Sequence, residues 1–286
     1  SPAESLIRPG STIRVSHAPG PGNGIVNGNP GRVVAWLVLA LMALANFGNY
    51  YVYDSIGPVA DLLQRQRDFS DSQIGMLNAL YSLPNVVLIL VGGILVDRFG
   101  TGRMLVWTAF ICLAGAALTA WSPSFSGMAA GRLLFGIGAE TFNIATIAAV
   151  VKYFSGRNLA LAIGTSIAVG RAGAFSVDMS PTWFAGAYAG GWQPPLVIAT
   201  ALAALSAAAV VAYWWLDRSR ACADPGTLGA ARRFSLRDLT GFGPAYWYLL
   251  VLCVLWYSVI FAFRSTFAIK YFQHAHGLDL AAAGAI

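Results

Sequence analysis

Two charged side chains lie inside long apolar stretches of the sequence: Glu140 in IGAETFNIAT and Arg171 in LALAIGTSIAVGRAGAF. A charge in such a segment is costly unless it faces a partner or a water-filled cavity. A carboxylate accepts hydrogen bonds from an ammonium group, and a guanidinium binds a carboxylate through two parallel hydrogen bonds. If both side chains face one cavity, they make a complementary site for a small zwitterion with separated ends.

The expected depth of the two residues supports this pairing. At a rise of 1.5 Å per residue, Glu140 lies roughly 18 Å along its helix from Lys152, and Arg171 roughly 21 Å from Arg157. Both charges therefore lie at similar height, near the middle of the membrane. Two alternatives remain open: a structural pair that only joins two helices, and a proton-carrying role for Glu140.

The composition indicates a membrane protein. Of 286 residues, 57% are hydrophobic and 10% are charged, and the mean hydropathy is +0.63. Soluble domains carry about 25% charged residues, so this composition indicates a protein surrounded by lipid rather than water. The net charge of +6 would also suit a nucleic-acid-binding protein. The charges fall between apolar runs, however, so we expect a lipid bilayer and no nucleic acid as partner.

Enzyme and metal chemistry are not indicated. The cysteines Cys112, Cys222 and Cys253 lack CxxC spacing, which argues against a disulfide framework and a zinc site. The pair His274 and His276 is too small for a metal site. No nucleotide-binding loop, nucleophile triad or zinc-protease motif is present. The sequence therefore predicts no enzyme activity, no cofactor and no metal.

Seven apolar segments are each close to the roughly 20 residues that a helix needs to cross a membrane. They span about 33–54, 73–96, 104–121, 128–152, 158–180, 195–216 and 244–270, and an eighth begins near Leu280. Lipid cannot satisfy backbone polar groups, so these segments are predicted to be helices. The predicted fold class is all-α integral membrane.

The chain divides into four predicted regions. These are a disordered cytoplasmic tail (1–31), a six-helix bundle (32–216), a cytoplasmic linker (217–243) and the beginning of a second bundle (244–286). The connections on the side of the N-terminus hold most of the Lys and Arg residues, which predicts a cytoplasmic N-terminus. The 16 Arg against two Lys, the many Ala residues and the lack of an N-x-Ser/Thr sequon favour a bacterial cytoplasmic membrane over a lysosomal one.

The segment GGILVDRFGTGR matches the pattern G-x-x-x-D-R-x-G followed by a basic residue. The matching residues are Gly93, Asp97, Arg98, Gly100 and Arg103. This segment resembles the cytoplasmic signature loop of the major facilitator superfamily. The resemblance implies a transporter built from two six-helix halves, which these charges latch together in the outward-facing state. The alternative is that this segment is a helix-to-helix connection whose basic residues only fix its cytoplasmic location, with no latch function.

A second stretch, GRLLFGIG, resembles the R-x-x-x-G-x-G pattern of the fourth helix in the same superfamily. Gly136 and Gly138 are expected to allow close helix packing. Arg132 is either a functional group or an anchor that reaches to the outer interface.

Five stretches occur in the order of one branch of this superfamily, the branch that contains a lysosomal dipeptide transporter. They read NYYVYD, YSLPNVV, GRLLFGIGAE, KYFSGRNLALAIG and VGRAG. The resemblance implies that Glu140 and Arg171 contact the two termini of a bound dipeptide. It also implies a basic residue on the seventh helix, for which Arg264 and Lys270 are the candidates.

Further polar residues are candidates for the same cavity. On the first segment, Asn46, Asn49, Tyr50 and Tyr53 recur at three- and four-residue spacing. They either line the cavity or hydrogen-bond to neighbouring helices. Asn143 lies one turn from Glu140 and is expected to orient it. Pro84 is expected to kink the second segment, and Asp178 is expected near the outer interface.

The predicted function is alternating-access transport of a small zwitterion, most simply a dipeptide. One alternative is a proton-coupled permease for organic anions, with Arg171 as the main ligand and Glu140 carrying the proton. Another is a non-transporting membrane scaffold or sensor. Whether an accessory subunit is needed stays open.

Overall fold

The computed structural model describes residues 31–221 and 243–285, and within these ranges the regular structure is helical. The predicted tail, apart from Gly31, and residues 222–242 of the predicted linker lie outside the described residues.

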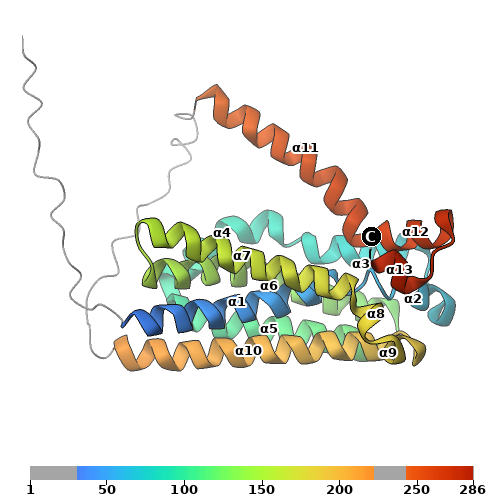
Figure 1. Cartoon of the computed structure of the whole chain (residues 1–286), viewed down its shortest axis with the longest axis horizontal. Helices are drawn as coiled ribbons and strands as arrows, with labels where there is room; N and C mark the ends of the chain where they lie inside the picture. Colours follow the sequence, from blue (N-terminus) through green and yellow to red (C-terminus); the bar gives the residue numbers. More distant parts are fainter. Residues whose placement is uncertain (1–30, 222–242, 286) are drawn as a thin grey trace, which may run out of the picture.

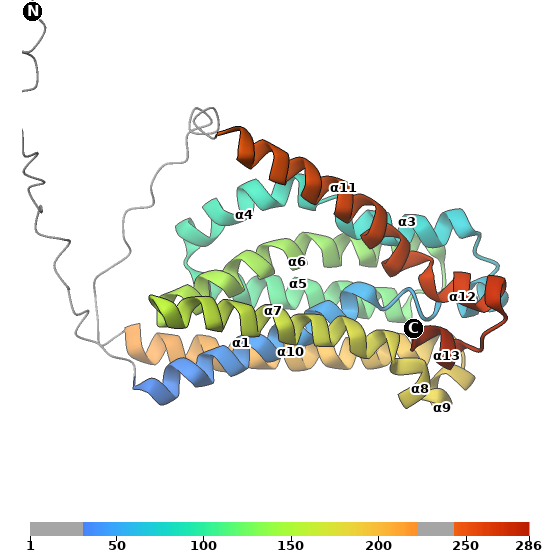
Figure 2. The ribbon, with the colours of Figure 1, turned by 45° about the horizontal axis from the view of Figure 1, so that its top comes forward.

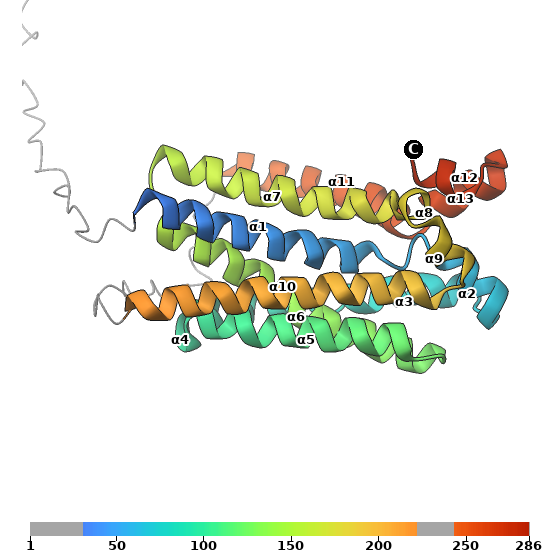
Figure 3. The same ribbon diagram turned by 60° about the horizontal axis from the view of Figure 1, so that its bottom comes forward.

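Five long helices form the body of the molecule (Figure 1). They are α1 (Arg32–Asp54), α5 (Thr101–Trp121), α6 (Phe125–Tyr153), α7 (Arg157–Asp178) and α10 (Gln193–Ala221). Each of them is long and apolar enough to cross a membrane. In Figure 3, α7, α1, α10 and α5 follow one another across one face of the bundle, and neighbouring members of this row pack together.

The second predicted membrane segment is broken into α3 (Asp71–Ser82) and α4 (Asn85–Phe99). Pro84 lies at the break and precedes the first residue of α4. Proline lacks the N–H that a continuous helix needs and its ring clashes with the preceding turn. The kink that the sequence predicts at Pro84 is therefore confirmed.

Shorter helices gather at one end of the bundle. They are α2 (Ala60–Arg67), α8 (Ser180–Trp183), α9 (Ala185–Ala189), α12 (Ala268–His276) and α13 (Leu280–Gly284). We call this end the far end. At the opposite end, which we call the latch end, α4 turns into α5 at Gly100 and α6 turns into α7 (Figure 1).

Close helix packing places α6 at the centre of the bundle, in contact with α1, α3, α4, α5 and α7. A Cβ atom on Gly136 would lie 2.1 Å from the carbonyl oxygen of Tyr81 on α3. A Cβ atom on Gly138 would lie 2.7 Å from the sulfur of Cys112 on α5. The predicted role of these two glycines is thus confirmed, because any larger residue would push α6 away from its neighbours.

Helix α11 (Pro244–Thr266) diverges from the bundle (Figures 1 and 2). Residues 244–258 are exposed, whereas the helix packs on α3 and α12 near its C-terminal end. The predicted single segment 244–270 is wrong at its end, since α11 stops at Thr266 and α12 continues after Phe267. The helix expected near Leu280 begins there as α13.

Candidate substrate site and the two ends of the bundle

Tyr50 on α1 packs against Arg171 and interacts electrostatically with Glu140. Glu140 on α6 and Arg171 on α7 both lie within electrostatic range of the Tyr50 hydroxyl. The guanidinium carbon of Arg171 lies 5.3 Å from the centre of the Tyr50 ring. Glu140 is half-buried and Arg171 is exposed. The Arg171 guanidinium therefore lies against a phenol of a neighbouring helix, and the Glu140 carboxylate lies in the same region of the bundle.

The polar residues of α1 divide between two roles that the sequence left open. The Asn46 amide donates to the Ser166 hydroxyl at 2.8 Å, so Asn46 joins α1 to α7. Asn49 is buried, and its side-chain oxygen accepts no hydrogen bond from the described residues. The Tyr53 ring packs edge-on against Tyr81, with 4.1 Å between ring centres. Asn49 thus keeps an acceptor for a water or ligand, whereas Tyr53 belongs to an aromatic contact.

Glu140 also interacts electrostatically with Tyr53 of α1. Asn143, one turn further along α6, is half-buried. Its role in orienting Glu140 stays a prediction.

Arg264 on α11 lies in an ion-pair network that joins three helices. Its guanidinium donates to an Asp54 carboxylate oxygen at 2.9 Å and also to Asp178. Asp54 belongs to α1 and Asp178 to α7, so one side chain connects α11 to both helices. The Asn78 amide of α3 donates to the Thr266 hydroxyl at 3.1 Å beside this network. Arg264 therefore lies between charged partners at the far-end termini of α1 and α7.

Arg132 does not reach to an interface, so the interfacial-anchor interpretation is wrong. The residue is 1% exposed. It donates to the carbonyl oxygens of Val52 at 3.0 Å and Tyr53 at 2.7 Å, and it lies 4.5 Å from the Tyr81 ring centre. The last carbonyl groups of a helix have no hydrogen-bond donor within that helix. Arg132 on α6 donates to two such carbonyl groups at the end of α1.

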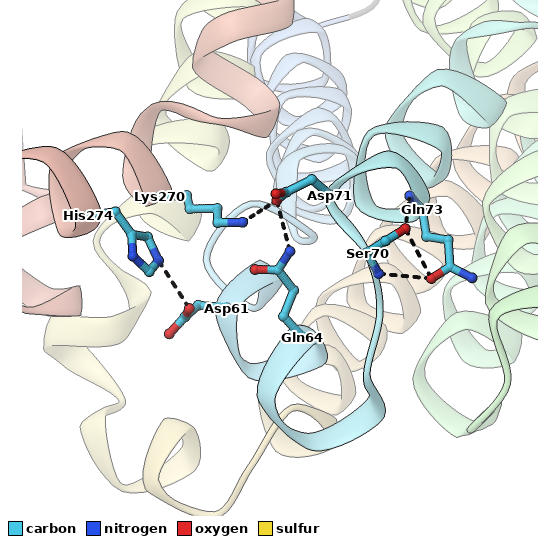
Figure 4. Close-up of polar contacts among 7 residues, drawn as sticks. All are labelled: Asp61, Gln64, Ser70, Asp71, Gln73, Lys270 and His274. Atoms are coloured by element: carbon cyan, nitrogen blue, oxygen red, sulfur yellow. Dashed lines mark hydrogen bonds and ion pairs between the residues drawn. The ribbon is translucent and has the colours of Figure 1, made fainter.

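A second polar cluster at the far end joins α12 to α2 and α3 (Figure 4). Lys270 pairs with Asp71, which also accepts from the Gln64 amide at 2.8 Å. His274 lies 3.4 Å from Asp61. The hydrogen bonds from Lys270 and then Gln64 lower the pKa of Asp71. Lys270, the other candidate for the seventh-helix cation, therefore pairs with one carboxylate outside the five long helices, that of Asp71.

A tight turn lies at the latch end, where Gly100 links α4 to α5 with a φ angle of +86°. Asp97, Arg98 and Arg103 are exposed. No salt bridge of these three side chains occurs among residues 31–221 and 243–285. The latch-end turn is therefore formed, while its charged side chains are exposed on the described part of the chain.

The Major Facilitator Superfamily model matches residues 42–286 of this chain. The chain belongs to the major facilitator superfamily. It is thus a multi-pass membrane protein of a transporter superfamily, and the superfamily consists of transporters rather than enzymes.

Several curated relatives in this superfamily align with most of the chain. It is 29% identical to the human "Lysosomal dipeptide transporter MFSD1" over 266 residues, 87% of this chain and 56% of that protein. The mouse protein of the same name is 30% identical over 82% of this chain and 54% of its own length. A "Probable anion transporter 3, chloroplastic" from Arabidopsis thaliana is 27% identical over 49% of this chain and 27% of that protein. The chain spans about half the length of the dipeptide transporters that it matches.

Within this superfamily protein, sequence reasoning identified the charges at the site but not the contacts that surround them. Asp178 was expected only near the outer interface and Asp54 was not singled out, although both bind Arg264. The signal that could have found them is the acidic residue at the end of each predicted segment. Because their partner lies 210 and 86 residues away, spacing alone could not reveal the network.

Proposed function

We propose that this protein moves dipeptides across its membrane by alternating access, with Glu140 binding the amino terminus and Arg171 the carboxylate. The observation that carries the proposal is that Arg171 packs on Tyr50 of α1, while the opposite charge of Glu140 acts electrostatically on the same phenol. An ammonium needs an acceptor and a carboxylate is best held by a guanidinium. A zwitterion with separated ends satisfies both groups at once.

The arrangement of the two ends supports alternating access. At the far end, α11 is tied to α1 and α7 through Arg264. Towards the latch end, α11 diverges from the bundle (Figure 2), and its residues 244–258 are exposed. A rocking motion that exchanged the two arrangements would expose the region around Tyr50 first to one side and then to the other.

Relatives named as dipeptide transporters support this substrate class. Arg264, Asn49, Tyr53 and Asn143 are proposed to line the same route, with Arg264 closing its far end. We further propose that the latch end, and with it the N-terminus, faces the cytoplasm. The basic residues Arg98 and Arg103 support that orientation, and a bacterial cytoplasmic membrane fits the composition. Labelling of a cysteine at position 103 by a membrane-impermeant reagent would test the orientation.

A second candidate is an organic-anion permease in which Arg171 is the main ligand and Glu140 carries a proton. Arg171 is exposed and so accessible to an anion. A relative named "Probable sulfoacetate transporter SauU" from Cupriavidus necator is 26% identical over 36% of this chain and 24% of that protein. The two candidates differ in whether the substrate needs a free amino terminus.

The deciding experiment is uptake of a labelled dipeptide into proteoliposomes that contain the full-length protein. We expect saturable uptake that free dipeptides inhibit and end-blocked dipeptides do not. Glu140→Gln and Arg171→Ala should each abolish it, whereas Arg65→Ala, which removes an exposed charge on α2, should retain it. Uptake that persists in both site variants would reduce the two charges to a structural role. Inhibition by carboxylates without an amino group would favour the anion permease.

A further inference from the structure

The ring of Tyr50 is held in place by the helix that carries Arg171. A Cβ atom on Gly170 would lie 2.8 Å from one Tyr50 ring carbon and 3.0 Å from the next. The ring therefore packs directly on the α7 backbone at the residue preceding Arg171. Only a glycine at position 170 leaves room for this contact without displacing the ring.

The same ring packs against the Arg171 guanidinium, whose carbon lies 5.3 Å from the ring centre. An arginine over an aromatic ring is held by attraction between its charge and the ring, and its planar group carries N–H donors around its rim. Arginine otherwise loses considerable rotamer freedom when it is fixed. A ring already fixed on α7 reduces that loss, because the guanidinium is oriented before the ligand arrives.

The Tyr50 hydroxyl reaches the other parts of the site. It lies within electrostatic range of Glu140, of Asp54 and of Tyr257 on α11, besides Arg171. The close contacts of Tyr50 are made by its ring, which packs on Gly170 and on the Arg171 guanidinium.

From this geometry we propose that Tyr50 is a positioning residue that orients Arg171 and so sets the preference of the site for a ligand carboxylate over a carboxamide. The inference rests on the proposed function, and it deepens it by naming the residue that makes the site selective for a free C-terminus. The ring, rather than the hydroxyl, carries this role.

The test compares two competitors of labelled dipeptide uptake by the full-length protein in proteoliposomes: alanyl-alanine and alanyl-alanine amide. The readout is the ratio of their inhibition constants, amide over free acid. Tyr50→Leu should lower this ratio about threefold, since a cation–ring contact at an exposed arginine typically changes affinity by such a factor. Tyr50→Phe should keep the wild-type ratio, because the ring is retained.

A second variant disturbs the contact between the Tyr50 ring and Arg171 without changing Tyr50 itself. Gly170→Ala should displace the ring and lower the ratio in the same direction. Gly164→Ala is the matched control on α7, because a Cβ atom there meets nothing within 4 Å, and it should leave the ratio unchanged. Gly170→Ala also keeps the proposal testable if Tyr50→Leu does not fold.

The outcomes separate the inference from the proposed function. A wild-type ratio in folded Tyr50→Leu and Gly170→Ala proteins would overturn the inference while dipeptide transport stands. A loss in Tyr50→Phe as large as in Tyr50→Leu would also overturn it, because the hydroxyl would then be responsible. A wild-type protein that transports no dipeptide would overturn the proposed function and this inference together.

Discussion

The two ends of the bundle hold their charges in opposite ways. At the far end, Arg264 pairs with Asp54 and Asp178 and joins α11 to α1 and α7. At the latch end, Asp97 and Arg98 are exposed, and the N-terminal end of α11 diverges from the bundle (Figure 1). The far end is thus closed by charges between helices, whereas the latch end is open towards α11.

Burial makes these two sets of charges differ in energy. The Asp54 side chain is 2% exposed, and a buried carboxylate is stable only with a partner. In contrast, the latch-end pair of Lys152 and Asp217 has side chains that are 50% and 14% exposed, and a pair with an exposed partner contributes less to stability. Closure at the far end should therefore depend strongly on Arg264, while single charges at the latch end should matter little for folding.

The largest effect is expected from Arg264→Gln. This change leaves Asp54 buried without its cation, which should lower the free energy of unfolding by about 2–3 kcal/mol. The loss should be smaller than for a fully buried ion pair, because Arg264 is partly exposed and water screens its charge. It should also open the far end. Thermal unfolding in detergent and modification of a cysteine at position 78 by a thiol reagent would measure both effects.

Arg264→Lys is the matched variant for this prediction. It keeps the charge but cannot bridge two carboxylates as a planar guanidinium does, so an intermediate loss is expected. An Arg264→Gln protein with wild-type stability and an unreactive cysteine would show that the far end closes without this network.

A smaller effect is expected at the latch end from Gly100→Ala. Gly100 has φ +86° and ψ 142°, a conformation that costs a residue with a Cβ atom about 2 kcal/mol. The melting temperature should fall, while the far-end cysteine should stay unreactive.

Gly93→Ala provides the control within the same motif. Gly93 lies in α4, and a Cβ atom there meets nothing within 4 Å. Alanine should therefore be neutral or stabilising by up to about 1 kcal/mol. Equal destabilisation by both substitutions would argue against the turn geometry as the cause.

The smallest effect concerns Asp71, whose pKa is lowered by Lys270 and Gln64. A carboxyl group whose pKa is lowered in the folded state stabilises that state fully at pH values above its unfolded pKa, about 4. This stabilisation is lost as the pH falls through the lowered pKa of the folded state. Melting temperatures measured from pH 6 to pH 3 should therefore fall more for the wild type than for Asp71→Asn. Parallel curves would show that this exposed pair contributes nothing.

The spans of the long helices could be predicted because apolar length is a local property of the sequence. The predicted segment 33–54 corresponds to α1 (Arg32–Asp54), and 104–121 lies within α5 (Thr101–Trp121). The short helices α2, α8 and α9 were not predicted. They lie at the far end, where few apolar residues follow one another and packing on the bundle decides the path of the chain.

The sequence by itself determined the membrane environment, the superfamily motifs and the two charges at the site. A charge within an apolar segment stands out without knowledge of its neighbours. Only the tertiary structure decided what those charges contact. It placed Arg171 against Tyr50, buried Arg132 on the last carbonyls of α1, and paired Arg264 with two carboxylates. These contacts join residues on different helices, and the packing of those helices depends on side chains far apart in the sequence.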